Sequence, residues 1–124
     1  MSTAAQKLIN KTRQQTLAQQ VRVANNFWTR TKGLLGEKSL PAGNALWIQG
    51  SRWVGCNSIH TFFMQFAIDA VFVDRDMKVK AIYRNLGPWR VTSPALGAFS
   101  VFEMPAGTLD SFKVEVGDLL HVGD

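Results

Sequence analysis

The sequence predicts a mainly β fold, in the form of a compact β-sandwich or barrel-like domain with one short helix near its N-terminus. From residue 45 onward, short apolar runs alternate with turn-forming residues, which is typical of sandwiches and barrels rather than of βαβ sheets. Ten Gly and four Pro are spread along the 124 residues, so frequent turns and no long helices are expected. Eight Phe and four Trp supply enough apolar area for a single core.

The N-terminal part of the chain divides into a tail, a strand and a helix. Residues 1–16 are polar and rich in Gln, so we expect a flexible basic tail, followed by a single β-rich domain over residues 17–124. Apolar residues alternate over 17–24 and predict the first strand. An apolar spacing of i, i+4, i+7, i+8 over 27–35 predicts the short helix, and Gly36 is suited to end it.

The rest of the chain is a series of short strand patterns. Residues 74–77 (DRDM) lie between two apolar runs and predict a hairpin turn. Gly-Pro, Ser-Pro and Pro-Ala-Gly sequences separate the later strands. The expected strands are 45–49, 58–64, 69–73, 78–84, 98–103, 112–116 and 119–122.

The formal net charge of +5 is concentrated at the N-terminal end. Residues 1–36 contain six Lys or Arg and no acid, whereas the remainder is nearly balanced. Such a segment suits an anionic partner, which can be a nucleic acid, a membrane surface or an acidic protein. A solvated basic tail explains the same charges, and no helix-turn-helix, RRM or zinc-finger pattern accompanies them.

Cysteine usage and hydropathy bear on location. Cys56 is the single cysteine, so no internal disulfide is expected and a reducing compartment is the simpler interpretation. The first residues contain no apolar run of signal-peptide length. No segment approaches the roughly 18 apolar residues of a membrane span. We therefore expect a cytoplasmic protein without a transmembrane segment, and the sequence points to no particular cofactor.

Residues 55–69 (GCNSIHTFFMQFAID) contain a candidate ligand-binding face. In an extended strand Cys56, Ser58 and His60 point to the same side, together with Met64. A straight strand separates Cys56 from His60 by about 13 Å. That span is too long for both to bind one metal at about 2–2.3 Å, or for His60 to activate Cys56 as a nucleophile. We therefore expect no metal here, unless a turn at Cys56 closes the gap.

Four other residues are candidate ligand contacts. Trp53 lies in a polar stretch and suits stacking against sugar rings or bases. Arg90 follows a Gly-Pro-Trp corner and suits a carboxylate, a phosphate or an internal acid such as Glu103. Glu103 is also able to orient His60. Asp69 begins an apolar strand, so it is either a structural hydrogen-bond hub or part of a ligand site.

Several short motifs follow one another along the chain: RTKGLLG at 30–36, CNSIHT at 56–61, Met64, AID at 67–69 with VFVD at 71–74, LGPWR at 86–90, EMPAG at 103–107 and GD at 117–118. As an ordered set these motifs resemble the domain of unknown function 192 family. The resemblance covers about residues 20–123. It implies a compact β-sandwich-like domain with a short helix near its start, and no established activity. Two departures concern Met77, where relatives often have a turn glycine, and residues 50–54, which look longer than usual.

Three functional hypotheses follow. The first is a non-catalytic module that binds a small ligand or a glycan, because no complete catalytic set is visible; its site is built from Cys56, Ser58, His60, Trp53 and Arg90. The second is a metal-dependent or hydrolytic enzyme that uses His60 with Asp69 or Glu103. The third is a macromolecular interaction domain that uses the basic N-terminus.

Overall fold

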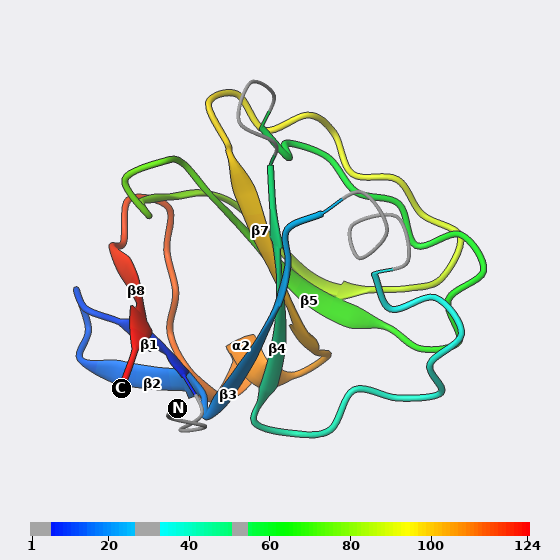
Figure 1. The fold of residues 1–124 in the computed structure, drawn as a ribbon, viewed down its shortest axis with the longest axis horizontal. Helices are drawn as coiled ribbons and strands as arrows, with labels where there is room; N and C mark the ends of the chain where they lie inside the picture. Colours follow the sequence, from blue (N-terminus) through cyan, green and yellow to red (C-terminus); the bar gives the residue numbers. More distant parts are fainter. Residues whose placement is uncertain (1–5, 27–32, 51–54) are drawn as a thin grey trace.

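A computed structural model describes residues 6–26, 33–50 and 55–124 (Figure 1). The described strands form two sheets: a small sheet in the order β2-β1-β8 and a large sheet in the order β3-β4-β7-β5-β6. No helix of these residues is long and apolar enough to cross a membrane. The elements are β1 Lys7–Asn10, β2 Gln15–Ala18, β3 Gln20–Ala24, β4 Asn44–Gln49, β5 Ile68–Val73, β6 Val79–Leu86, β7 Ser100–Pro105, α2 Thr108–Ser111 and β8 Leu120–Gly123. The mainly β fold expected from the sequence is therefore confirmed.

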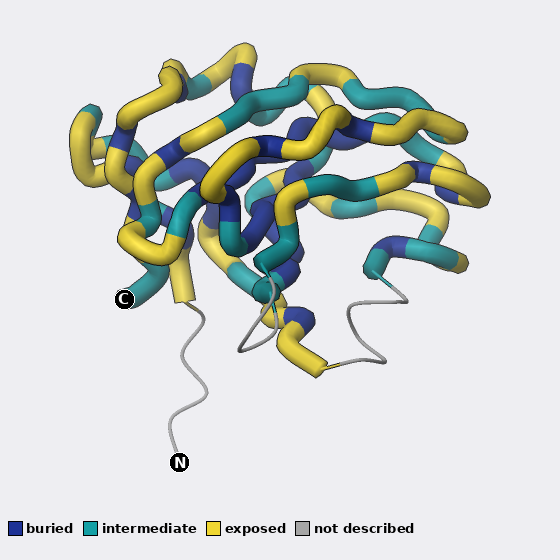
Figure 2. The backbone as a smooth tube through the Cα atoms, turned by 90° about the horizontal axis from the view of Figure 1, so that it is seen from above, coloured by how far each residue is buried: buried dark blue, intermediate teal, exposed yellow. Residues whose placement is uncertain are grey.

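The large sheet has one face toward the small sheet and one face toward loops. On the small-sheet face, Val71, Phe102 and Met104 pack with Leu8 and Leu17 of the small sheet. On the loop face, the large sheet is covered by the segments 33–40, 55–66 and 91–98, which we call the loop layer. Figure 2 shows buried residues running through the middle of the molecule and exposed ones at the turns. The residues of the loop-face core are Ala24, Leu34, Leu46, Ile48, Met64, Ile68, Ala70, Phe72, Ala95, Ala98 and Val101.

Residues 7–16 belong to the domain rather than to a flexible tail. β1 lies in the middle of the small sheet, antiparallel to β2 and β8, and the side chain of Leu8 is completely buried. The expected strand over 17–24 is split: β2 pairs with β1, whereas β3 pairs in parallel with β4 in the large sheet. The four-residue strand β1 carries too little local pattern to predict, because its partner β8 lies at the other end of the chain.

Among the described residues, two of the expected strands are absent, and the expected helix is represented only by its C-terminal end. The expected helix over 27–35 lies mostly at residues outside the described ranges, and its end at 33–36 is a turn. The described helix, α2, is on the C-terminal side and follows Gly107, whose φ of 95° suits glycine. Residues 58–64 form no strand and make one isolated bridge, His60 to Val91. Residues 112–116 also form no strand. Residues 59–61 make backbone hydrogen bonds to residues 90–92, but in the part of the chain that is described these bonds do not continue into a ladder.

The hairpin expected at residues 74–77 is present between β5 and β6. The Asp74 carboxylate accepts hydrogen bonds from the backbone N–H groups of Asp76 and Lys78, each at 2.9 Å. Met77 has a φ of 69°, so it takes the left-handed conformation that a turn glycine would otherwise supply. The side chain at this departure from the family pattern is thus accommodated by a turn that the Asp74 carboxylate stabilises.

Candidate functional site

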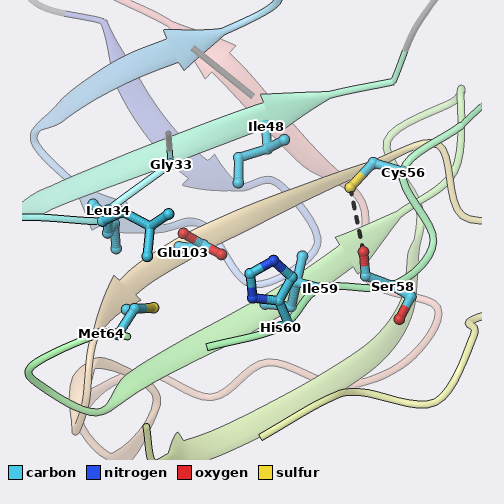
Figure 3. Close-up of a pocket in the computed structure, with 10 residues that line it drawn as sticks. Gly33, Leu34, Ile48, Cys56, Ser58, Ile59, His60, Met64 and Glu103 are labelled. Carbon is cyan, nitrogen blue, oxygen red and sulfur yellow. Dashed lines mark hydrogen bonds between the residues drawn. The ribbon is translucent and has the colours of Figure 1, made fainter. Parts of the chain in front are cut away.

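A pocket of about 190 Å³ lies between the loop face of the large sheet and the loop layer (Figure 3). Apolar side chains form most of its wall. The polar lining comes from β7 and from the loop that follows residue 55. The lining residues are Gly33, Leu34, Leu35, Ile48, Cys56, Ser58, Ile59, His60, Met64 and Glu103. We call this cavity the Glu103 pocket.

Glu103 is the acidic residue of this pocket. It lies on β7 opposite Leu46 of β4 and Ala70 of β5, so neighbouring strands flank it on both sides. Strand alternation places its side chain on the loop face, like Val101. The residue is only 3% exposed, and its carboxyl group receives no hydrogen bond from the described residues. Burial raises the pKa of Glu103 to about 7.

In Figure 3 the Glu103 carboxyl group lies between Leu34 and the His60 ring. His60 is exposed at the edge of the pocket. Its Nδ1 accepts a hydrogen bond from the backbone N–H of Phe62 at 3.2 Å. An Nδ1 that accepts leaves the ring proton of neutral histidine on Nε2. The imidazole therefore offers a second polar group to a molecule that enters the Glu103 pocket.

Cys56 and Ser58 reach the same pocket because residues 55–58 do not run as a straight strand. A Cβ atom at Gly55 would lie 2.6 Å from the Ala98 carbonyl oxygen, so only glycine allows this close approach. The Cys56 N–H then donates to the Phe99 carbonyl at 2.8 Å. Its Sγ lies 3.8 Å from the Ser58 carbonyl oxygen. The segment thus brings Cys56 to the cavity that His60 also lines.

The Ser58 hydroxyl is engaged in the loop layer. It donates to the Thr92 carbonyl at 2.8 Å and lies 3.4 Å from the Thr92 hydroxyl. The Thr92 hydroxyl in turn accepts from the Ile59 N–H at 3.0 Å. Since the Ser58 proton is directed to a carbonyl, it is not directed to His60. This contact holds together two segments of the loop layer.

Asp69 and Arg90 do not line the pocket. Asp69 is 1% exposed, and its carboxylate accepts backbone hydrogen bonds from Asn85 at 2.8 Å, Gly107 at 3.1 Å and Leu109 at 2.9 Å. It therefore anchors the turn that leads into α2. Arg90 is exposed, and its backbone pairs with Thr61. Trp53 lies outside the described residues.

Sequence reasoning did not foresee an aromatic strip beside the pocket, which we define as His60, Phe62, Phe63 and Trp89. The ring of Phe62 stacks on His60 with 5.0 Å between centroids and lies 6.0 Å from the ring of Trp89. Phe63 and Trp89 are 4.6 Å apart, and their exposed fractions are 69% and 59%. Both have positive φ values, 65° and 62°, which are unfavourable for aromatic residues. The sequence signals for this strip are the FF pair at 62–63 and the GPW corner at 87–89. They are far apart in the sequence, and only a tertiary contact brings them together.

Buried Thr61 holds the aromatic strip in place. Its hydroxyl donates to the Gly87 carbonyl at 2.6 Å and accepts from the Arg90 N–H at 2.9 Å. Its backbone carbonyl accepts from the Trp89 N–H at 2.9 Å. These bonds connect the loop that carries Phe63 to the corner that carries Trp89.

Metal binding has no support in the described ranges 6–26, 33–50 and 55–124. No group of three or more His, Cys, Asp or Glu in these ranges is placed to hold a metal ion. Cys56 and His60 share a pocket, but the second histidine, His121, is on β8 in the small sheet.

Together these features define a class: a two-sheet β domain with a small, mostly apolar pocket that contains one buried acid. The model of the DUF192 family, described as "Uncharacterized ACR, COG1430", matches residues 8–122, and the chain belongs to this family. A UPF0127 protein of Thermococcus sibiricus is 32% identical over 111 residues, which are 90% of this chain and 71% of the relative. A UPF0127 protein of Pyrococcus horikoshii is 32% identical over 111 residues, 90% of this chain and 94% of the relative.

Two solved structures show the same fold. A protein of unknown function from Novosphingobium aromaticivorans aligns with a TM-score of 0.78 at 17% identity, over 94% of this chain and 83% of that one. A protein from Sinorhizobium meliloti aligns with a TM-score of 0.76 at 17% identity, over 98% of both chains. These likenesses establish the architecture of the two sheets.

Proposed function

We propose that this domain is a non-catalytic binding module that holds a small ligand in the Glu103 pocket. The observation that carries the proposal is the Glu103 carboxyl group, which belongs to a residue only 3% exposed, lines a cavity and receives no hydrogen bond from the described residues. Buried polar groups are nearly always paired, so an unpaired one beside a cavity is a mark of a binding site. A ligand supplies the missing partner.

Glu103 lowers the stability of the unliganded domain. A pKa raised from 4.5 to about 7 corresponds to about 3 kcal/mol of lost folding free energy above pH 7. An apolar residue at the same position would avoid this cost. Strain or unsatisfied groups of this kind are typical of positions that serve binding rather than stability.

The size of the pocket limits the ligand. Its volume of about 190 Å³ is near that of an engineered apolar cavity of about 150 Å³ that binds benzene. It is below the about 300–1,000 Å³ of pockets for drug-sized molecules. We therefore expect the enclosed part of the ligand to contain about six to ten non-hydrogen atoms. Leu34, Ile48 and Met64 favour an apolar body.

Binding fits the contacts better than the hydrolytic alternative. A covalent mechanism needs a nucleophile, a base and a group that orients the base. The Ser58 proton is directed to the Thr92 carbonyl, and Asp69 lies on the opposite face of the sheet. Of the three residues in the enzyme hypothesis, His60, Asp69 and Glu103, only His60 and Glu103 line the cavity.

A ligand-binding assay on the full chain tests this proposal. Thermal shifts are measured for wild type, Glu103→Gln and Asp110→Asn with cyclohexanol, benzyl alcohol, benzylamine and benzoate. Asp110→Asn is the matched control, because Asp110 is an exposed acid on α2. A ligand at a hundredfold excess over its Kd adds about 2.7 kcal/mol of stability. We expect at least one compound to stabilise wild type and the control but to act differently on Glu103→Gln. Equal responses of all three proteins, or none, would contradict the proposal.

A glycan is a second candidate ligand, favoured by the exposed pair Phe63 and Trp89. Aromatic faces stack on sugar rings, and large exposed apolar side chains that cluster mark interaction sites. Titration with methyl glycosides, followed by the amide NMR signals of Phe63 and Trp89, tests this candidate. We expect shifts in wild type that Trp89→Ala removes, and unperturbed signals would reject the glycan.

A further inference from the structure

We infer that the ligand of the Glu103 pocket bears a protonated primary amine that pairs with the Glu103 carboxylate. This inference rests on the proposed binding function and adds the chemical class of the ligand. The juxtaposition that supports it is one buried carboxyl group in a pocket whose wall is mostly apolar.

Among residues 6–26, 33–50 and 55–124, no cationic side chain neutralises the carboxyl group. The titratable side chains that line the pocket with Glu103 are His60 and Cys56. His60 has its Nδ1 engaged with the Phe62 N–H, and the Cys56 Sγ lies against the Ser58 carbonyl. No Lys or Arg of the described residues forms an ion pair with Glu103. The strands that flank it contribute Leu46 and Ala70 as direct neighbours, which are neutral.

A cationic ligand gains more binding free energy from this site than a neutral ligand does. Charge-assisted hydrogen bonds are shorter and about twice as strong as neutral ones. A buried carboxylate with no partner is costly, and a paired one recovers much of that cost. A neutral alcohol pairs with the protonated acid by an uncharged hydrogen bond, so it recovers less of the cost of burying the carboxyl group. A carboxylate ligand is disfavoured by like charge.

The amine is a primary one attached to a small apolar body. An ammonium group carries three donors at one point, which suits a single carboxylate in a small cavity. A guanidinium group needs a wider planar opening and would leave several donors facing Leu34, Ile48 and Met64. The pocket volume of about 190 Å³ suits a body the size of a cyclohexyl or benzyl group.

Matched pairs of probes test the inference. Calorimetric titrations of the full chain compare benzylamine with benzyl alcohol and cyclohexylamine with cyclohexanol at pH 8. We expect each amine to bind at least about tenfold more tightly than its alcohol, which equals about 1.4 kcal/mol. Glu103→Gln, which keeps the shape and removes the charge, is expected to lose this preference. Asp110→Asn is expected to keep it.

The pH dependence of wild type gives an independent measurement if Glu103→Gln fails to fold. Amine affinity is expected to rise between pH 6 and pH 8, because Glu103 ionises over this range. The same rise is expected in His60→Ala. If the rise disappears in His60→Ala, the titrating group is His60, and the pairing with Glu103 is overturned.

The outcomes separate the two proposals. Alcohols that bind wild type as tightly as their amines overturn the amine assignment and leave ligand binding in place. Amines preferred equally by wild type and Glu103→Gln overturn the role of Glu103. If neither member of any pair binds and no compound of the thermal-shift set acts, both proposals fail.

Discussion

Asp69 and Glu103 lie on neighbouring strands and point to opposite faces of the large sheet. Asp69 pairs with Met104, and Ala70 pairs with Glu103, so the two acids are diagonal neighbours. Both are buried, with exposed fractions of 1% and 3%. Asp69 accepts three backbone hydrogen bonds, whereas the described residues supply none to Glu103. The first carboxylate therefore stabilises the fold, and the second is available to a ligand.

Glu103→Gln is expected to change how stability depends on pH. The folded-state pKa of Glu103 is about 7, above the ordinary 4.5. Between these values the unfolded chain releases a proton that the folded chain keeps, so wild type loses stability as pH rises from about 4.5 to 7. Relative to wild type, the variant should gain up to about 3 kcal/mol between pH 4.5 and pH 8. Urea denaturation at both pH values measures this, and a constant difference would contradict it.

Asp69→Asn is expected to destabilise the domain without affecting the pocket. The amide replaces one acceptor oxygen by an NH₂ group, which faces backbone donors at Asn85 or at Gly107 and Leu109. A buried donor without an acceptor costs about 1–3 kcal/mol. Denaturation measures this loss, and titration with the ligand found for wild type should give an unchanged Kd. A weaker Kd in a folded variant would place Asp69 in the ligand site.

Phe63→Gly is expected to stabilise the unliganded protein by up to about 1 kcal/mol, because glycine tolerates the φ of 65° at this position. The Phe63 side chain is 69% exposed and buries little apolar area. Phe62→Gly is the matched control, since Phe62 lacks a positive φ and stacks on His60. The control should lose stability. Melting temperatures compare the two, and a less stable Phe63→Gly would show that its ring contact with Trp89 outweighs the strain.

Asp118→Asn is expected to weaken the link between the chain ends. Burial by itself would raise the pKa of Asp118, but hydrogen bonds from Arg13, Asn10 and the Glu115 N–H outweigh burial and lower it. A lowered pKa contributes stability above the unfolded value, and this stability is lost as pH falls through the folded value. The variant should lose about 1–3 kcal/mol at pH 7, and the loss should shrink below about pH 4.

The control for this prediction is Glu115→Gln. The Glu115 side chain is 57% exposed in its ion pair with Arg13, so its loss should change stability by less than about 1 kcal/mol. Denaturation at pH 7 and pH 3 gives both comparisons. An Asp118→Asn variant whose deficit stays the same at low pH would show that the carboxylate charge is not the cause.

Local pattern was sufficient for much of the fold. The mainly β class, the family, the hairpin at residues 74–77 and the strands that became β4, β5, β6, β7 and β8 follow from alternation, turn residues and motifs. Such signals arise within a few residues, so a single sequence carries them. The presence of strand β1 and the absence of a strand at 58–64 both depend on contacts with segments that are distant in the sequence. No local pattern contains information on such contacts.

The candidate site shows the same division. The sequence by itself determined that Cys56, Ser58, His60 and Glu103 are polar or reactive groups in a β-rich domain, and the structure lines one pocket with all four. Only the tertiary structure decided that Asp69 faces away and that Glu103 has no donor in the described residues. The physical reason is strand register: a shift of one residue reverses the face of a side chain, and pairing between distant segments sets that register.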